Sequence, residues 1–120
     1  AATRDFYAQL EALRDEGVLV VASGDIVHNL RLFDWRDQTP LPWALRFRDR
    51  ANALIRDSDV AALADWPALG EDARLSIPTP EHYIPLLYAL ALAREGDALE
   101  FFNDDVIGSL SMTSLLIGHA

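Results

Sequence analysis

The chain has 120 residues, a net charge of −9 at pH 7 and no cysteine, which limits it to about one domain and excludes disulfides and thiolate metal sites. The acidic balance argues against nucleic acid as a partner, because binding phosphates requires clustered cations. No apolar run approaches the roughly 20 residues that span a bilayer, and the N-terminus lacks the apolar segment of a secretory signal. We therefore expect no membrane partner and a cytoplasmic location.

The first predicted elements are a helix and a strand. Residues 3–16 carry apolar side chains at helical spacing, and Gly17 follows in the position that commonly ends a helix. The continuous apolar run over residues 18–22 is typical of a strand buried on both faces of a parallel sheet. Because ligands bind beyond the carboxyl ends of strands in open α/β sheets, His28 comes to a position suited to chemistry.

The middle of the chain is predicted to be helical with one irregular stretch. Apolar residues return to helical spacing over residues 43–56. A second, shorter helix is predicted over residues 59–65, with Asp59 or Ser58 as its N-cap. Residues 66–76 show no clear periodicity and are expected to be irregular.

The last part of the chain is predicted to hold one helix and two strands. A tight turn over residues 79–83 precedes a helix over residues 84–95, because proline inside a helix would remove a hydrogen bond. Residues 99–103 and 106–117 are predicted as strands, with Gly108 as a bulge in the second.

These elements predict an α/β fold that ends in two β-strands. A single parallel-type strand cannot bury both faces within so small a unit. The strand expected over residues 18–22 therefore requires neighbours that the chain does not obviously supply. We expect the chain to be the C-terminal portion of a larger α/β domain.

Histidine is the candidate functional residue type. His28 follows the predicted strand, His82 lies in the proline-bracketed turn, and His119 lies near the end of the chain, where we expect it to be inert. Imidazole is the commonest metal-ligating side chain and a proton shuttle near neutral pH. Ordinary capping roles would also explain His28 and His82, and a metal site needs at least three protein ligands. Three carboxylates are possible third ligands, although each also fits the surface: Asp25, Asp34 and Glu81.

Three ordered motifs carry a resemblance to a known family. The run over residues 10–31 contains the Ser-Gly turn before His28, residues 79–88 read Thr-Pro-Glu-His-Tyr-Ile-Pro-Leu-Leu-Tyr, and residues 108–112 read Gly-Ser-Leu-Ser-Met. Together they resemble the C-terminal half of LigB-type (class III) extradiol ring-cleavage dioxygenases, most closely the 4,5-DOPA dioxygenase branch. The resemblance extends from about Phe6 to Gly118 and implies that the chain is the C-terminal portion of a LigB-like sheet flanked by helices.

The resemblance implies an enzyme that opens a catechol, DOPA-like or another aromatic diol, with O2 at one non-haem metal. That metal would be Fe(II), or Zn(II) in a resting or purified form. His82 is implied as a metal ligand and His28 as the acid–base group, with His28 an additional ligand in the zinc form. Asn29, Arg31 and Tyr83 are the implied contacts with substrate, although a surface ion pair also explains Arg31 and core packing also explains Tyr83.

The family's remaining histidine ligands come from a Gly-His-Gly loop and a Ser-Ala-His strand end in its N-terminal half, and neither motif occurs here. We therefore expect residues 1–120 to form the C-terminal part of a single catalytic domain that needs the missing half, and oligomerisation stays open. Two other readings are a non-catalytic binding or interaction protein on the same scaffold, and a zinc-dependent hydrolase with Glu81 as base.

Overall fold

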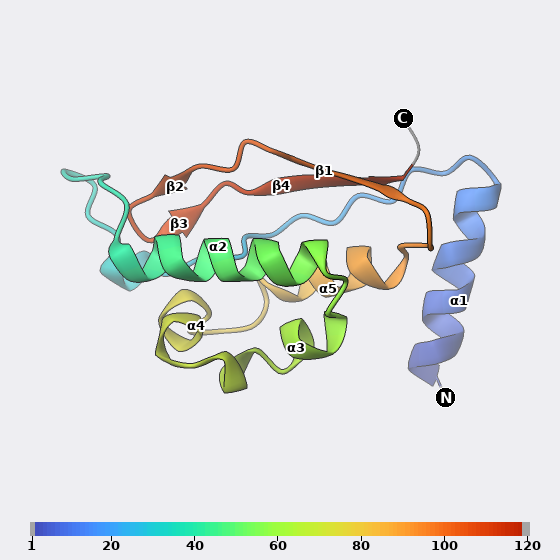
Figure 1. The fold of residues 1–120 in the computed structure, drawn as a ribbon, viewed down its shortest axis with the longest axis horizontal. Coiled ribbons are helices and arrows are strands. Elements are labelled where there is room, and N and C mark those ends of the chain that lie inside the picture. Colours follow the sequence, from blue (N-terminus) through green and yellow to red (C-terminus); the bar gives the residue numbers. More distant parts are fainter. Residues whose placement is uncertain (1, 119–120) are drawn as a thin grey trace.

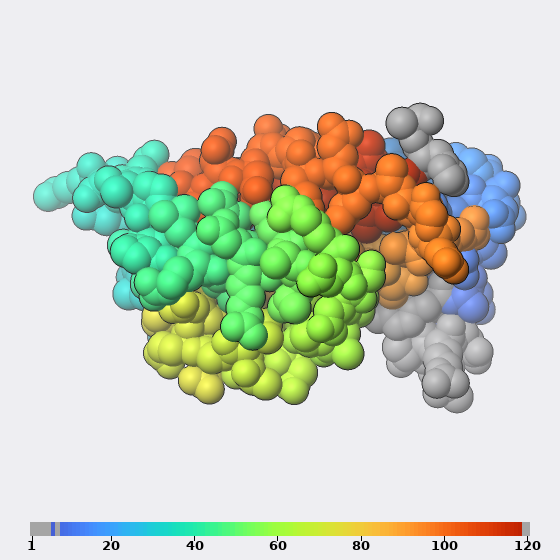
Figure 2. All heavy atoms as spheres, in the orientation of Figure 1, coloured from blue at the N-terminus to red at the C-terminus, as the bar shows by residue number. Residues whose placement is uncertain are grey.

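Helices cover one face of a layer of short strands in residues 2–118, the part of the chain that the computed structural model describes (Figure 1). The predicted α/β class is confirmed. A loop around residues 34–39 projects from one end of the molecule (Figure 2). No helix among the described residues is both long and apolar enough to cross a bilayer.

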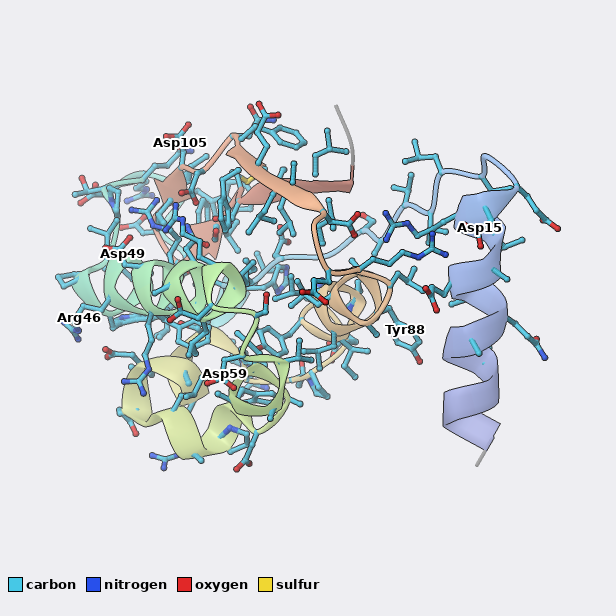
Figure 3. All side chains as sticks on the ribbon, turned by 45° about the vertical axis from the view of Figure 1, so that its right-hand side comes forward. Asp15, Arg46, Asp49, Asp59, Tyr88 and Asp105 are labelled. Atoms are coloured by element: carbon cyan, nitrogen blue, oxygen red, sulfur yellow. The ribbon has the colours of Figure 1, made fainter. Side chains whose placement is uncertain are left out.

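The first helix, α1 (Ala2–Asp15), confirms the predicted helix over residues 3–16 and stands at one end of the molecule (Figure 1). Two hydrogen bonds of 2.8 Å join the Arg14 guanidinium to the Asp97 carboxylate. Arg94 donates to Glu11 at 2.7 Å. In Figure 3 the Tyr88 side chain extends from the neighbouring helix toward α1. Charged side chains thus attach the end of α1 to the connection that precedes the strands.

The predicted buried strand over residues 18–22 is wrong. The segment is extended, but it has no ladder partner among the described residues, and Leu19 and Val21 are 75% and 78% exposed. Pairing begins only at His28, which forms an isolated antiparallel bridge with Leu110. An apolar run becomes a buried strand only where neighbouring strands cover it, and residues 2–118 supply none here.

Four α-helices and two 3-10 turns make up the remaining helical structure: η1 (Leu30–Leu32), α2 (Pro42–Arg56), α3 (Val60–Ala64), η2 (Trp66–Leu69), α4 (Glu71–Ser76) and α5 (Ile84–Ala91). The helices predicted over residues 43–56 and 59–65 are confirmed as α2 and α3. Asp59 caps α3, because its carboxylate accepts a 3.1 Å hydrogen bond from the Ala62 amide.

The prediction of an irregular stretch over residues 66–76 is wrong, because η2 and α4 occupy it. Gly70, with φ of +107°, joins the two short elements. Acidic side chains at Glu71 and Asp72 favour the start of α4 through the helix dipole. Elements this short contain too few turns to show a period in the sequence.

Helix α5 begins where predicted, at Ile84, but ends at Ala91 rather than at residue 95. Pro85 lies in its first turn, where the missing amide proton would have no intrahelical partner. The turn before it is closed by hydrogen bonds from the Tyr83 and Ile84 amides to the Pro80 carbonyl. This turn carries His82.

The strands form two antiparallel pairs. β1 (Ala98–Phe102) pairs with β4 (Ser114–Gly118), and β2 (Val106–Ile107) pairs with β3 (Leu110–Ser111). The prediction of one strand over residues 106–117 is therefore wrong, and residues 98–118 form four strands rather than two. Gly108, with φ of +57°, lies in the β2–β3 turn instead of a bulge.

The hydrophobic core lies between the strands and the helices. Four side chains that represent this core are almost fully buried: Phe47 and Ile55 of α2, Leu63 of α3, and Val27, which follows the extended segment. Alternate residues of β1 and β4 pack against this core, as the two-residue period of a strand requires: Leu99, Phe101, Leu115 and Ile117. The core therefore fixes the position of the chain immediately before His28.

Candidate metal site

Three side chains that could bind a metal meet at the junction of the extended segment and the turn before α5. Asp25, His28 and His82 each offer one ligand atom, and these atoms lie within 4.8 Å of one another. All three residues are partly buried. The two histidines that the sequence singled out are therefore neighbours in space, although more than fifty residues separate them in the sequence.

A close contact of two backbones brings the carboxylate to the histidines. The Asp25 amide donates a 2.7 Å hydrogen bond to the His82 carbonyl. A Cβ atom on the preceding Gly24 would lie 2.2 Å from the same carbonyl oxygen. Only glycine allows the segments to approach this closely without a shift of one of them.

His28 is fixed by backbone pairing and by its neighbours. Its amide donates to the Ser76 carbonyl at 2.9 Å. The Asn29 side chain is buried, donates to the Leu75 carbonyl at 2.8 Å and accepts from the Leu32 amide at 3.3 Å. These bonds hold the backbone of His28 between η1 and the end of α4.

The two imidazole rings lie face to face. Their centroids are 3.6 Å apart and their planes differ by 17°. The His82 side chain is 42% exposed, so the pair is reachable from solvent on that side. Glu81 lies nearby, with an Oε1 atom 4.0 Å from Nε2 of His82, and accepts a 2.7 Å hydrogen bond from the Thr79 hydroxyl. That hydrogen bond lowers the pKa of Glu81.

Burial and the two histidines act on Asp25 in opposite directions. Burial raises the pKa of the Asp25 carboxyl, and the neighbouring His28 and His82 lower it by a smaller amount. A bound divalent cation would compensate the desolvated carboxylate more strongly than two imidazoles do. Two histidines and one carboxylate form the donor set that proteins use to bind non-haem Fe(II) while leaving positions open.

No protein-family model matches the chain. It is 40% identical over 116 residues to the 4,5-DOPA dioxygenase extradiol of Escherichia coli strain K12, and 26% identical over 101 residues to the 4,5-DOPA dioxygenase extradiol of Beta vulgaris. This chain is a homologue of part of the 4,5-DOPA extradiol dioxygenases. The resemblance inferred from its motifs is confirmed.

The homology covers most of the chain but less than half of each dioxygenase. The matches include 92% and 84% of this chain, against 42% and 38% of the E. coli and B. vulgaris proteins. The crystal structure of an uncharacterized protein from E. coli K12 superposes with a TM-score of 0.76 at 38% identity, over 91% of this chain and 46% of that one. The chain thus spans about two fifths of the curated dioxygenases.

The other residues that the sequence suggested lie outside this cluster. Tyr83 is 1% exposed, and its hydroxyl donates a 2.7 Å hydrogen bond to the Leu63 carbonyl, so the structure places it in the core. Asn29 is occupied by the backbone bonds described above, and Arg31 is exposed on η1. His119 lies outside the described residues.

Asp25 is the residue whose importance the sequence understated. It was one of three candidate carboxylates, each of which also fitted the surface, and the structure brings only this one of them into the cluster with the two histidines. Its position directly after a glycine and three residues before His28 is the local signal that distinguishes it. The decisive contact, with the His82 carbonyl, is a tertiary one.

Proposed function

We propose that this chain is the C-terminal part of an extradiol dioxygenase domain that opens a catechol, DOPA-like or another aromatic diol, with O2 at a non-haem metal. The observation that carries the proposal is the convergence of Asp25, His28 and His82 in a homologue of part of the 4,5-DOPA dioxygenases. Its partners would be the catechol and O2, together with the rest of the dioxygenase domain.

In this proposal His82 is a metal ligand and Asp25 supplies a carboxylate beside it. Imidazole and carboxylate donors suit Fe(II), with Zn(II) as the ion that occupies a resting or purified form. When bound, Fe(II) would hold the diol and O2 together and transfer electrons between them. His28 would act as the acid–base group that transfers protons to and from the substrate. Its ring stacks on the ring of His82 and therefore lies next to the proposed metal position. In the zinc form His28 would serve as an additional ligand.

The proposed metal site would also account for a need for the remainder of the domain. In these roles only Asp25 and His82 of this chain would hold the ion, and the His82 side chain is 42% exposed, so the ion would be open to water and weakly held. Ligands from the rest of the domain would complete the set and close the site. We therefore expect this chain alone to bind Fe(II) weakly and to be inactive.

The first test is anaerobic Fe(II) titration of this chain by calorimetry, followed by an aerobic oxygen-uptake assay with DOPA. The expected result is weak binding at one site and no oxygen uptake. Tight binding with a yellow ring-opened product would contradict the need for the remainder of the domain. Once the remainder is supplied, oxygen uptake would exclude both a non-catalytic binding protein and a zinc hydrolase using Glu81.

Variants of the completed enzyme separate the two histidines. His28→Ala is expected to retain its metal and lose turnover by about 10²- to 10⁴-fold, the usual contribution of an acid–base group. His82→Ala is expected to lose metal affinity, and His119→Ala serves as a control that also removes one histidine. Metal content by mass spectrometry and oxygen uptake give the two readouts. Metal loss in His28→Ala, or full occupancy in His82→Ala, would overturn these roles.

A further inference from the structure

The extended segment over residues 18–24 exposes both its side chains and its backbone. Its sequence, Val-Leu-Val-Val-Ala-Ser-Gly, contains no charged residue. Within residues 2–118, no amide or carbonyl between Leu19 and Gly24 bonds to another backbone group. Proteins usually protect such edges with charges, proline or a covering element, because an apolar edge pairs readily with another strand.

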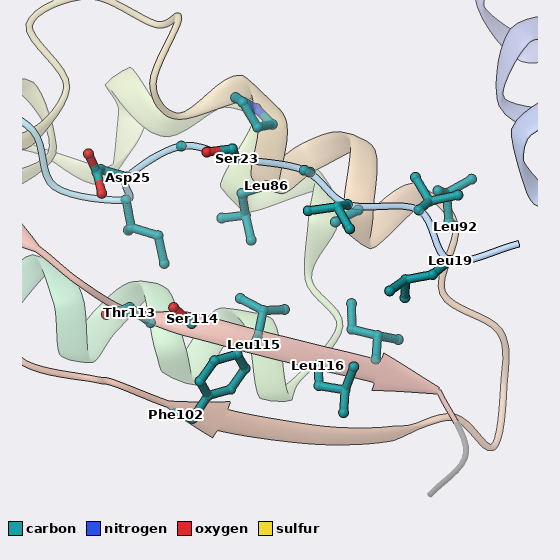
Figure 4. Close-up of a pocket in the computed structure, with 18 of the residues that line it drawn as sticks. Leu19, Ser23, Asp25, Leu86, Leu92, Phe102, Thr113, Ser114, Leu115 and Leu116 are labelled. Carbon is teal, nitrogen blue, oxygen red and sulfur yellow. The ribbon is translucent and has the colours of Figure 1, made fainter.

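A groove of about 500 Å³ lies beside this segment. Figure 4 shows the segment along one side of it and β4 with Phe102 along the other, while Leu86 extends from α5 into the space between them. The lining is mostly apolar and includes Leu115 and Leu116 of β4. At one end the groove reaches Asp25 and His82 of the metal site.

The chain from residue 18 to residue 29 is paired with the last strands at one end only. Backbone hydrogen bonds join the two at residues 27–29, and none within residues 2–118 joins them along residues 19–24. Next to the groove, the Ser111 amide donates to the Val27 carbonyl at 2.9 Å, and the Asn29 amide donates to the Ser109 carbonyl at 3.1 Å. Beyond these bonds the segment and β4 run in opposite directions on the two sides of the groove (Figure 4). A further strand along residues 18–24 would continue the pairing and cover the exposed apolar side chains.

We propose that residues 18–24 and this groove bind an apolar β-strand from the complementary part of the dioxygenase domain. That part corresponds to the polypeptide that the longer homologues carry outside the matched region. Those homologues have more than half of their length there, since this chain spans 42% of the E. coli dioxygenase and 46% of the superposed E. coli protein. A second copy is a poorer occupant, because each copy carries a net charge of −9.

The surface itself follows from exposure and unpaired backbone, whereas the identity of the partner rests on the proposed function. The bound strand would add main-chain hydrogen bonds along the segment, and the groove would select apolar side chains. Because the groove ends at Asp25 and His82, the strand would reach the edge of the metal site.

The test is co-expression of this full chain with the unmatched part of the E. coli dioxygenase as a separate, tagged polypeptide. The expected result is a one-to-one complex in which residues 19–24 lose deuterium uptake relative to the chain alone. Failure to associate, both in co-expression and after joint refolding, would overturn the proposal. So would a complex in which residues 19–24 stay unprotected, or a homodimer of this chain that protects them.

Two pairs of variants test the contact itself. Val21→Pro removes an amide from the free edge and is expected to abolish the complex, whereas Val21→Thr keeps that amide and should retain it. Leu116→Glu places a charge in the groove and is expected to weaken the complex, with Leu30→Glu as the control at a similarly exposed position outside the groove (51% and 55% exposed). Equal binding by both members of each pair would contradict the proposal.

These measurements do not depend on metal or turnover. A complex that forms as described but consumes no oxygen with catechols would remove the proposed function and leave the strand-binding surface in place. Oxygen uptake by a complex that leaves residues 19–24 unprotected would support the proposed function and contradict the strand-binding surface.

Discussion

Tyr83 shows how a residue beside a candidate metal ligand can be held in the core. It follows His82 in the sequence, yet its ring is buried edge-on to Trp66, with centroids 6.3 Å apart, and its hydroxyl bonds to the Leu63 carbonyl. This bond joins the turn that carries His82 to the end of α3. The Tyr83 side chain therefore fixes the position of the turn relative to α3.

Tyr83→Phe is expected to destabilise the chain by about 1–3 kcal/mol, because it leaves a buried carbonyl without its partner, and to leave metal binding unchanged. Burial also raises the pKa of Tyr83. At pH values below the ordinary tyrosine pKa of about 10, the contribution of Tyr83 to stability is complete. This contribution is lost as the pH rises toward the raised pKa, because the tyrosine ionises first in the unfolded chain. Urea unfolding at several alkaline pH values should show a shallower decline for Tyr83→Phe. An equally steep decline would place the tyrosine in an exposed site.

At the scale of elements, the candidate metal site depends on the contact between the extended segment and the turn before α5. Gly24→Ala is expected to push these segments apart, since the new methyl group would lie 2.2 Å from the His82 carbonyl oxygen and 3.1 Å from the Pro85 side chain. Overpacking of this kind typically costs about 1–3 kcal/mol. Because Asp25 would move away from the histidines, affinity for Co(II), measured by its absorption spectrum, should also fall. The neighbouring exposed residue offers the control, Ser23→Ala, and equal affinity in the two variants would show that the contact is dispensable.

The sequence located the longer helices and β1, which confirms the strand predicted over residues 99–103, but it missed η2, α4 and the pairing of the other strands. Periodic apolar residues and the cap at Asp59 are local signals, and they located α1, α2 and α3. A strand is defined by its partners. The apolar run over residues 18–22 predicted a strand, but no other segment of residues 2–118 pairs with it. Gly108 was visible in the sequence, but whether it formed a bulge or a turn depended on its positive φ.

The candidate metal site was also predicted only in part, because some of its features depend on tertiary contacts rather than on local sequence. Residue type and motif pointed to His28 and His82, and the structure brings their rings into contact. Selecting Asp25 among the candidate carboxylates required the tertiary contact with the His82 carbonyl. Burial likewise separates Tyr83 from the cluster, and neighbouring residues in a turn give no indication of which one faces the core.

At the scale of the whole molecule, the candidate site connects parts that are far apart in the chain. Asp25 and His28 belong to the stretch that links α1 to the helices, and His82 belongs to the turn that starts α5. The groove separates the same stretch from β4. A metal ion would therefore act as a crosslink at the point where the extended segment enters the core.

A crosslink of this kind should stabilise the folded chain in proportion to metal occupancy. A ligand that binds only the folded state at 100 times its dissociation constant contributes about 2.7 kcal/mol. We expect Zn(II), used as a redox-inert probe, to raise the thermal midpoint of this chain in a concentration-dependent manner. His82→Ala and Asp25→Asn should each reduce that rise, whereas His119→Ala should retain it. The midpoint is measured by circular dichroism, with excess chelator as the zero point. If Zn(II) shifts all variants equally, the ion binds elsewhere on the acidic surface, and the cluster of Asp25, His28 and His82 is not a metal site.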